Sequence, residues 1–353
     1  MQVTAPASLG AIARDTDARL DALLDEQRAK WASIDADLVG AFDEIRRMVR
    51  SGGKRLRPAF CYWGFVGAGG DPSDPRVIDA GAAFELMHAF ALFHDDVMDD
   101  SASRRGAATT HAMYALEHCS SGWAGESRRF GEGVAILVGD LALVLSDELM
   151  VGAPPEVWRL WNELRIELNV GQFLDILGSV QRDRRLDKAE RIARYKSGKY
   201  TIERPLHVGA LLAAPPQGAA LLADLSRYGL PLGDAFQLRD DVIGAFGDAS
   251  MSGKPVGDDL REGKPTPLLA RAVAGAGPEQ RKILERVGSP DLDEEDIASI
   301  QEVLIDTGAL AAVESRITEL AADAVAALGA TGLSSDARRE LTDLAAFVVG
   351  RAV

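Results

Sequence analysis

Four aspartates lie within six residues of the segment HDDVMDD (94–100), directly after a strongly apolar run. On a helix, Asp95 and Asp99 would share one face, and Asp96 and Asp100 would form a second pair with the same spacing. Such like-charge pairs destabilise an isolated helix by about 0.2–0.5 kcal/mol each. The alternative is a solvated acidic helix end, but the apolar run favours a helix that ends at the mouth of a cavity. Carboxylates without cysteines or clustered histidines favour a hard cation, above all Mg²⁺.

A second acidic segment, QLRDDVIGAFGD, covers residues 237–248. Its residues Gln237, Asp240 and Asp241 have the spacing i, i+3 and i+4, so on a helix they can point the same way. Mg²⁺ in proteins is usually held by a few carboxylates together with substrate phosphates. Two acidic helices that face each other across a cleft therefore predict a polyphosphate ligand between them.

Basic residues stand beside Gly, Pro or acidic residues at several points of the chain. The turn SGGKRLRP (51–58) opens a helix, where backbone N–H groups favour anions. A single such residue is more often a solvated surface charge, but their number in a net acidic protein predicts phosphate binding. The candidates are Lys54, Arg55, Arg57, Arg104, Arg105, Lys196, Lys199, Lys254 and Lys264.

Composition limits the classes of protein that need to be considered. The chain has 353 residues, of which 47% are hydrophobic, so it can bury a large core. Its net charge of −15 argues against generic binding to nucleic acid or anionic membranes. Two cysteines are too few for a disulfide framework, and a reduced cytoplasmic location fits them. We find no signal-peptide pattern and no apolar run of about 18 residues, so we expect no membrane span.

Apolar residues recur with helical periodicity along most of the chain, and period-two strand patterns are nearly absent. We expect an exposed loop at 119–133. Helices are expected near residues 16–50, 57–68, 76–101, 107–118, 133–150, 155–180, 186–213, 217–247, 266–274, 278–287, 294–307, 309–328 and 335–352.

The motifs GGKRLRP, HAFALFHDDVMDD with RRG, KSGKYT, QLRDDVIGAFGD and GKPVGDDLREGKPTPL occur in this order between about residues 50 and 268. Together they resemble the trans-isoprenyl diphosphate synthases (polyprenyl synthetases), for which a lone DDxxD motif would be weak evidence. The resemblance implies an all-α fold of the isoprenoid synthase type, a single large helical bundle around a deep central cavity, and a homodimer. We expect one domain over residues 1–353, with residues 1–15 as a flexible tail.

The resemblance also implies a reaction. Enzymes of this family condense isopentenyl diphosphate head-to-tail with an allylic diphosphate (dimethylallyl, geranyl or farnesyl) and release diphosphate. Mg²⁺ is the implied cofactor, with three ions bound beside the allylic diphosphate. Phe90 and Ala91, five and four residues before Asp95, resemble the pattern of geranylgeranyl diphosphate synthases. A farnesyl or longer-chain synthase remains the alternative for the product.

Residue roles carry over from the family motif by motif. The resemblance implies that carboxylates from the two acidic segments bind Mg²⁺, namely Asp95, Asp99 and Asp240, with Asp96 and Asp241 in support. The allylic diphosphate would be contacted by Arg104, Lys196 and Lys254, with Lys264 nearby. Isopentenyl diphosphate would be held by the backbone of Gly53 and by Lys54, Arg57, His88 and Arg105. The reacting centre would be lined by Ser197 and Gln237, and the catalytic set is Asp95, Asp99, Lys196, Gln237 and Asp240.

The second acidic segment departs from the family pattern at one place. Many members carry a third acid where this chain has Gly244. The next acid, Asp248, lies two helical turns beyond Asp241 and is too far away to replace it directly. Two further polar residues, Gln172 and Asp175, share one side of an expected helix and either line the cavity or only bond neighbouring helices.

Three other classes of protein share some of these features. A class I terpene cyclase needs no second diphosphate site, for which GGKRLRP and RRG argue. A ferritin-like di-iron bundle needs two Glu-x-x-His pairs, and Glu85 with His88 supplies one of them. A non-catalytic subunit of a heteromeric prenyl synthase would be expected to lose acids, whereas both acidic segments keep their leading Asp pair.

Overall fold

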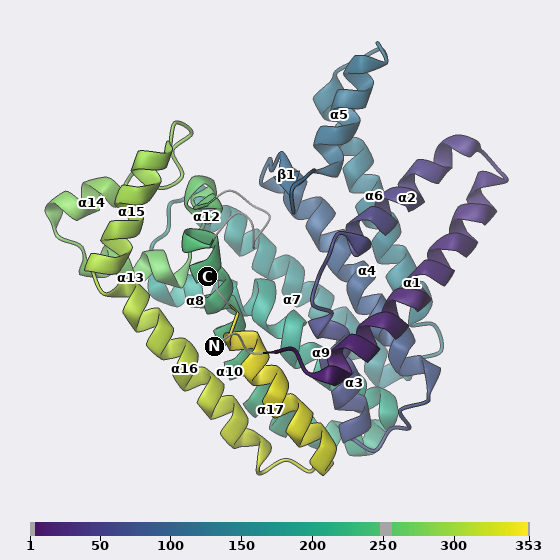
Figure 1. Ribbon diagram of the computed structural model, residues 1–353. Coiled ribbons are helices and arrows are strands. Elements are labelled where there is room, and N and C mark those ends of the chain that lie inside the picture. Colours follow the sequence, from purple (N-terminus) through teal and green to yellow (C-terminus); the bar gives the residue numbers. More distant parts are fainter. Residues whose placement is uncertain (1–3, 248–255, 352–353) are drawn as a thin grey trace. The chain divides into compact units, whose positions relative to one another are not determined.

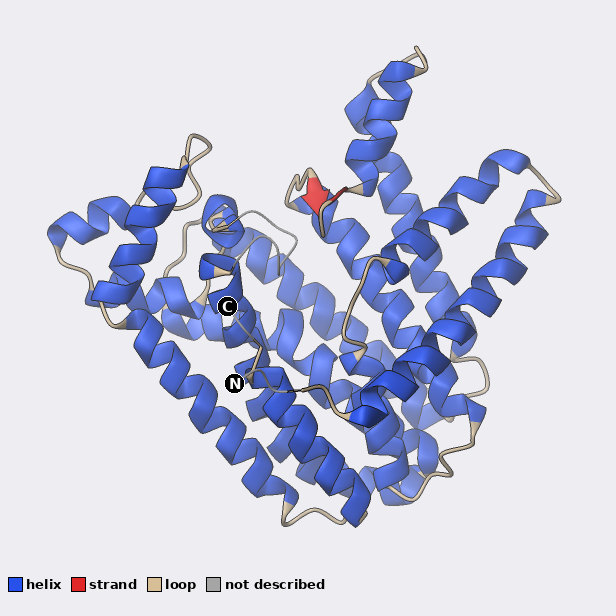
Figure 2. Cartoon of the chain, viewed as in Figure 1, coloured by secondary structure: helices blue, strands red, loops and turns tan. Residues whose placement is uncertain are grey.

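The computed structural model describes residues 4–247 and 256–351, and these residues are mainly helical (Figures 1 and 2). Within them, the strands are β1 (Ser103–Arg104) and β2 (Ala107–Ala108), which pair antiparallel with Ser103 opposite Ala108. The prediction of an all-α fold is confirmed. The deep central cavity stays a prediction.

The chain forms two compact units. The small unit contains Ala7–Tyr62 and Asp71–Pro154, and the large unit contains Trp63–Gly70 and the described residues from Pro155 onward. Each unit therefore draws on separate stretches of sequence. The prediction of a single domain is not tested by this division.

In the small unit, α4 is the central helix. Asp74 caps its start by accepting from the N–H of Arg76 at 3.0 Å, and most of the residues after the first turn are buried. It packs on α6, α1 and α2. The helices of this unit are α1 (Ala7–Ala32), the short 3₁₀ helix η1 (Ala36–Leu38), α2 (Val39–Arg50), the first part of α3 (Leu56–Gly67), α4 (Pro75–Met98), α5 (Thr110–Ser120) and α6 (Ser127–Leu149).

Four predictions about the small unit are wrong in their boundaries. The expected helix 16–50 is two α-helices, and α1 already begins at Ala7, so the expected flexible tail is wrong for residues 7–15, where Leu9 and Ile12 are buried. The expected loop 119–133 is helical from Ser127, because Glu126 accepts from two backbone N–H groups and starts α6. The expected helix at 107–118 begins three residues later, after the β1–β2 hairpin.

The large unit contains the remaining helices and the last part of α3. One of them, η2, is a π-helix that interrupts the expected helix 186–213, and α12 was not predicted. They are α7 (Pro155–Val180), α8 (Leu186–Ala193), η2 (Arg194–Glu203), α9 (Arg204–Ala213), α10 (Pro215–Phe246), α12 (Asp258–Glu262), α13 (Pro267–Gly275), α14 (Pro278–Leu284), α15 (Glu294–Asp306), α16 (Ala309–Leu328) and α17 (Ser335–Val349).

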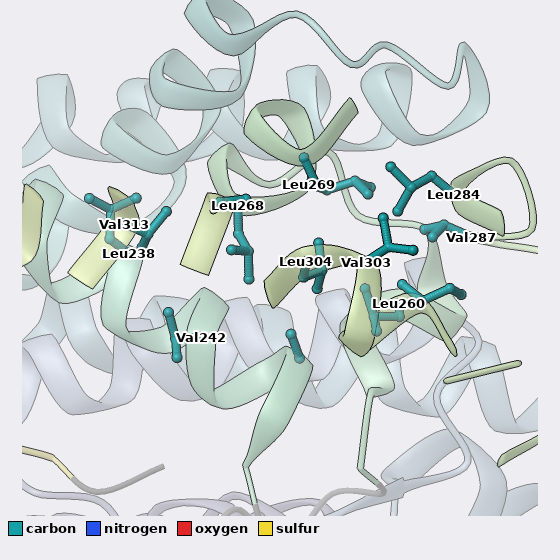
Figure 3. Packing of buried hydrophobic residues seen from close by; sticks show 14 of the residues in the cluster. Leu238, Val242, Leu260, Leu268, Leu269, Leu284, Val287, Val303, Leu304 and Val313 are labelled. Carbon is teal, nitrogen blue, oxygen red and sulfur yellow. The ribbon is translucent and has the colours of Figure 1, made fainter. Parts of the chain in front are cut away.

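The large unit's hydrophobic core fixes the helix that carries the second acidic segment. Leu238 and Val242 on α10 are buried with Leu260 of α12, Leu268 of α13 and Leu304 of α15 (Figure 3). Burial of a Leu or Val side chain stabilises a fold by about 1.5–3 kcal/mol. The core therefore holds α10 by one face and also holds α12 beside it.

Helix α4 is long and apolar enough to cross a membrane by length and composition, but 61% of the relevant window is buried inside the protein. A core helix of a folded domain passes the same test. The prediction of no membrane span stays a prediction.

Candidate active site

The predicted site residues are divided between the two units. In the small unit, α4 ends at Met98, and the N–H of Asp99 donates to the carbonyl of Asp95 at 2.8 Å. Asp95 and Asp99 therefore lie one turn apart on the same helix end, as the spacing predicts. Both are partly exposed, so their oxygens can reach a ligand.

The predicted pairing of Asp96 with Asp100 is wrong. Asp100 has a φ of 52°, in the left-handed region, so the helix does not continue through it. Its side chain is 67% exposed, whereas that of Asp96 is only 2% exposed. The two carboxylates therefore lie in different environments.

Asp96 is engaged by the β1–β2 hairpin. Arg104 on β1 donates from Nε to Asp96 Oδ1 at 2.8 Å, and its Nη2 lies 3.5 Å from Asp95 Oδ2. A charged hydrogen bond of this kind holds both groups in place. Asp96 is thus placed to orient Arg104 and Asp95, which fits the supporting role implied for it.

The hairpin turn connects the acidic helix end to the basic turn. Arg105 and Gly106 both have positive φ, as a two-residue hairpin turn requires. Arg105 Nη1 donates to the carbonyl of Gly52 at 2.6 Å and to Ser51 Oγ at 3.1 Å. Gly53 has a φ of 131°, a conformation that favours glycine. These contacts hold Arg105 beside Ser51 and Gly52, directly before Gly53 in the basic turn.

Arg55, in the same basic turn, is structural. Its Nη1 donates to Glu85 at 2.7 Å and its Nε to Asp17 at 2.9 Å, and the side chains of Arg55 and Glu85 are 6% and 5% exposed. Removing one partner of such a buried pair costs about 3–5 kcal/mol. Because Glu85 is used here, the di-iron alternative loses the Glu of its one candidate pair with His88.

Positive charges dominate the electrostatics around His88. Burial lowers the pKa of His88 well below its usual value, and Arg57, Arg105, Arg104 and Arg55 lower it further. Burial likewise lowers the pKa of Arg105, and its neighbouring arginines contribute. A neutral His88 among these guanidinium groups forms a region that favours an anion. Lys54 is exposed and Arg57 half-buried in the same stretch.

In the large unit, the π-helix η2 presents Lys196. Its Nζ donates to Asp175 Oδ2 on α7 at 2.6 Å. Gly171 allows this close packing, since a Cβ there would lie 2.3 Å from the Lys196 backbone nitrogen. Of the two alternatives for Asp175, the contact observed is a bond to a neighbouring helix. Ser197 is partly exposed beside Lys196.

Lys199, the second lysine of the same motif, belongs to a buried ionic network. It donates to Glu167, which also accepts from Arg204 Nε at 2.8 Å. Arg204 reaches Glu163 at 2.8 Å as well. Lys199 therefore anchors η2 to α7.

The second acidic segment gathers its predicted residues on α10. Gln237 Nε2 donates to Asp241 Oδ1 at 2.8 Å, as the i, i+4 spacing predicts. Burial raises the pKa of Asp241 well above its usual value, whereas the Gln237 hydrogen bond lowers it. Asp240 accepts from Arg351 Nη1 at 2.5 Å. Sequence reasoning missed Arg351, because no local pattern connects residues so far apart in the chain.

Lys264 and Lys254 were also predicted to belong to the site. Lys264 Nζ donates to Asp259 at 3.3 Å and also pairs with Glu262. Lys254 and Asp248 lie outside the described residues. Asp259 is the second residue that sequence reasoning missed, although it stands in the quoted motif GKPVGDDLREGKPTPL.

The predicted chain-length residues lie on α4 below the acidic end. Phe90 is buried, and its ring packs edge-on against His94 with 4.7 Å between ring centroids. His94 Nε2 lies 3.0 Å from the carbonyl oxygen of Ile136, which is a structural contact. Ala91 is partly exposed and precedes Asp95 by one turn.

The donor set suits Mg²⁺. Among the described residues, no group of three His, Cys, Asp or Glu side chains could hold a metal ion by itself. Mg²⁺ is typically bound by one or two carboxylates together with substrate phosphates. Asp241 is 4% exposed, and its Oδ2 has no hydrogen-bond partner within the described chain. A buried carboxylate oxygen of this kind fits a cation that arrives with its ligand.

Comparison with known sequences decides the family. The profile of the polyprenyl synthetase family matches residues 42–304. This chain belongs to the polyprenyl synthetase family. The prediction drawn from the five motifs is thereby confirmed. The match covers both acidic segments and the basic turn.

Relatives in the polyprenyl synthetase family differ in their named products. The chain is 33% identical over 304 residues to a geranylfarnesyl diphosphate synthase of Aeropyrum pernix, with 83% of this chain and 88% of that protein covered. It is 30% identical over 324 residues to a (2E,6E)-farnesyl diphosphate synthase of Mycobacterium tuberculosis, covering 89% and 84%. A geranylgeranyl diphosphate synthase of M. tuberculosis is 36% identical over 226 residues, covering 62% and 59%.

Solved structures of the family resemble this chain over nearly its whole length. Geranylgeranyl pyrophosphate synthase from Corynebacterium glutamicum, complexed with isoprenyl diphosphate and magnesium, has a TM-score of 0.89 and 37% identity, covering 96% of this chain and 98% of that one. A polyprenyl synthase from Caulobacter crescentus CB15, complexed with calcium and isoprenyl diphosphate, has a TM-score of 0.79 and 29% identity, covering 97% of each chain. These likenesses support the isoprenoid synthase fold.

Proposed function

We propose that this polyprenyl synthetase is a Mg²⁺-dependent trans-prenyltransferase that condenses isopentenyl diphosphate with allylic diphosphates. The observation that carries the proposal is the end of α4. There, Asp95 and Asp99 lie one turn apart, and a group of arginines surrounds a His88 whose pKa is lowered. Carboxylates suit a diphosphate that arrives with cations, whereas guanidinium groups bind a diphosphate directly.

Each diphosphate would then have its own set of residues. Asp95, Asp99 and Asp240 would hold Mg²⁺, with three ions in the complete complex, and Asp96 and Asp241 would support them. Bound Mg²⁺ supplies neutralisation of the leaving diphosphate. The allylic diphosphate would also be held by Arg104, Lys196, Lys254 and Lys264. Isopentenyl diphosphate would be held by Gly53, Lys54, Arg57, His88 and Arg105.

The chain's own residues would orient the reactants and protect the cation. Ionisation of the allylic C–O bond leaves a carbocation, which must meet the isopentenyl double bond and not water. Ser197 and Gln237 would line this reacting centre. The new C–C bond leaves a second carbocation, and the released diphosphate would take the proton whose loss forms the product's double bond. No protein nucleophile is needed for these steps.

We infer that geranylgeranyl diphosphate is the product. The support is the pair Phe90 and Ala91 before Asp95, which resembles the pattern of geranylgeranyl diphosphate synthases, in which bulk before the first acidic motif limits the growing chain. A farnesyl or a longer product is the alternative, and the named products of the relatives include both kinds.

We also infer that the chain forms a homodimer. Four apolar side chains on α7 have helical spacing and are largely exposed: Ile166, Val170, Phe173 and Val180. Phe173 alone is 66% exposed. A continuous apolar stripe of this kind marks a surface that a partner covers. A second copy of this chain is the partner that we propose, in a reduced cytoplasm that suits two free cysteines.

Light scattering during size-exclusion chromatography tests the dimer. We expect the mass of two chains for the wild type and of one chain for Phe173→Glu. A monomeric wild type would contradict this part of the proposal.

A metal-dependent condensation assay tests the reaction. Purified protein is incubated with Mg²⁺, geranyl diphosphate and radiolabelled isopentenyl diphosphate. We expect a labelled acid-labile prenyl product and one diphosphate released per condensation, with both lost when EDTA is added. A folded protein that makes no labelled product would overturn the proposal.

A further inference from the structure

Lys196, the lysine that we propose for the allylic diphosphate, stands on an irregular stretch of backbone. The ten residues Arg194–Glu203 form the π-helix η2, whereas most π-helices in proteins are single turns inside an α-helix. A π-helix of this length therefore needs neighbouring elements that keep it from becoming an α-helix. The contacts that these neighbours make also determine where Lys196 lies.

Glycines let two helices approach η2 closely. A Cβ on Gly171 of α7 would lie 2.3 Å from the Lys196 backbone nitrogen, and a Cβ on Gly233 of α10 would lie 2.7 Å from the Gly198 carbonyl oxygen. The backbone of η2 is thus packed against both α7 and α10. A glycine has no side chain that binds a specific partner, so other residues must fix the position of η2 along these helices.

Ion pairs bind both ends of η2, and the pairs at its end are the more buried ones. At the start, Arg194 Nε donates to Asp234 Oδ1 of α10 at 3.1 Å, but Arg194 is 47% exposed and such solvated pairs contribute little. At the end, Glu167 of α7 accepts from Lys199 Nζ and from Arg204, whose Nε and Nη2 lie at 2.8 and 2.6 Å. Lys199 and Glu167 are each 13% exposed and Arg204 is 9% exposed. Loss of one partner from such a buried group leaves an uncompensated charge.

Glu167 joins two consecutive elements of the chain to α7. Lys199 lies on η2, and Arg204 is the first residue of α9, directly after η2. The two-pronged pair with Arg204 fixes direction as well as distance. Because Lys199 follows Lys196 by three residues on the same helix, any shift of the Lys199 backbone also moves Lys196.

We propose that Glu167 is a positioning residue of the prenyl transfer: it holds Lys199 and Arg204, and thereby fixes the π-helix that presents Lys196. This inference rests on the proposed function, since it takes Lys196 as a ligand of the allylic diphosphate. It also gives the second lysine of the motif KSGKYT a role, which is to secure the position of the first.

Removal of the Glu167 charge tests the proposal. Glu167→Gln keeps the shape of the side chain, and Glu163→Gln is the matched control, because Glu163 also lies on α7 and bonds Arg204 but is 59% exposed. We expect Glu167→Gln to lower kcat/KM for geranyl diphosphate by about 10–100-fold, since misplacing a group by about 1 Å can have such an effect. The KM for isopentenyl diphosphate should stay unchanged, and Glu163→Gln should match the wild type in both constants.

Binding of inorganic diphosphate provides a readout that needs no turnover. Titration calorimetry in the presence of Mg²⁺ compares the wild type, Glu167→Gln, Lys196→Ala and the double variant. We expect Glu167→Gln to weaken binding when Lys196 is present and to have no further effect in the Lys196→Ala protein, because Glu167 acts through Lys196. An equal loss in both proteins would overturn the proposal and assign Glu167 to the stability of the fold.

Variants of Lys199 provide a second test should Glu167→Gln fail to fold. Lys199→Met should weaken diphosphate binding in the same way, whereas Lys199→Arg, which keeps the charge, should retain it. Unchanged diphosphate affinity in folded Glu167→Gln or Lys199→Met would also overturn the proposal. A wild type that forms no prenyl product but shows the expected differences in diphosphate binding would refute the proposed function and leave the positioning role of Glu167 standing.

Discussion

Arg351 Nη1 lies 2.5 Å from Asp240 Oδ1, and the Arg351 guanidinium lies over the ring of Phe236, 4.4 Å from its centroid. Arg351, two residues after the end of α17 at Val349, thus covers a carboxylate that we propose as a cation ligand. Asp240 is 37% exposed, so this is a partly solvated ion pair, and such pairs contribute about 0.2–1 kcal/mol. Arg351 and a bound cation would therefore compete for Asp240 Oδ1.

Removal of Arg351 should therefore strengthen metal binding. We predict that Arg351→Gln increases Mn²⁺ affinity in the presence of inorganic diphosphate by about two- to fivefold, which corresponds to the free energy of a partly exposed pair. Titration calorimetry at moderate ionic strength measures the change. Weaker binding in Arg351→Gln would mean that Arg351 holds Asp240 in its working position.

Asp95 and Asp99 at the end of α4 should be essential for turnover, whereas the neighbouring Asp100 should not be. We predict that Asp95→Asn and Asp99→Asn each lower turnover by about 10²–10³-fold or more, because charge stabilisation at the leaving group is lost. Asp100→Asn is the matched control, since Asn tolerates the left-handed backbone that Asp100 adopts. It should keep turnover close to that of the wild type.

Far-UV circular dichroism completes this comparison. All three variants should retain wild-type helicity, because the side chains at positions 95, 99 and 100 are not part of the core. Loss of helicity in Asp95→Asn or Asp99→Asn would assign these acids a structural role.

His207 should make the free energy of unfolding depend on pH. Burial, with the charge of Arg204, lowers the pKa of His207 to about 3, and its Nε2 lies 3.2 Å from Ser226 Oγ. The unfolded chain, with a His pKa of about 6.5, binds a proton that the folded chain does not bind between these values. Stability is then retained above about pH 6.5 and falls as pH decreases toward 3, by at most about 1.4 kcal/mol per pH unit.

Urea unfolding at several pH values measures this dependence. We predict that His207→Gln loses less stability than the wild type between about pH 6.5 and pH 4.5. If the free energy of unfolding changes equally with pH in the two proteins, His207 is not the source of the pH dependence.

Phe90 should limit the length of the product. We predict that Phe90→Ala yields longer prenyl diphosphates, because the change removes a bulky buried ring from the position that the family pattern assigns to the chain-length limit. Leu92→Ala, a change on the same helix at a residue without an assigned role, should leave the product unchanged. Mass spectrometry of the products distinguishes these outcomes, and an unchanged product from Phe90→Ala would assign the limit to another residue.

Features that depend on local spacing could be predicted from the sequence. The bounds of α7 agree with the expected 155–180, because Pro155 starts the helix and apolar residues recur along it. The Asp95–Asp99 and Gln237–Asp241 relationships follow from one helical turn. The five motifs and their order along the chain are specific enough to indicate the family, which the family profile confirms.

Features that depend on an irregular backbone conformation, or on contacts between residues far apart in the sequence, could not be predicted. The left-handed φ of Asp100 separates it from Asp96, although their i, i+4 spacing in the sequence predicts that they share a helix face. A π-helix such as η2 has no distinct apolar period. The contact of Gly244 with Asp259 joins two helices, so the sequence alone presents the glycine only as a missing acid.

The central claim is that this chain elongates an allylic diphosphate with isopentenyl diphosphate. The most direct measurement supplies purified protein with Mg²⁺, isopentenyl diphosphate and, in separate reactions, dimethylallyl, geranyl or farnesyl diphosphate, and identifies the products by mass spectrometry. We predict geranylgeranyl diphosphate from each starter that the enzyme accepts. A folded protein that forms no prenylated product with any starter would contradict the claim and favour a non-catalytic subunit of a heteromeric synthase.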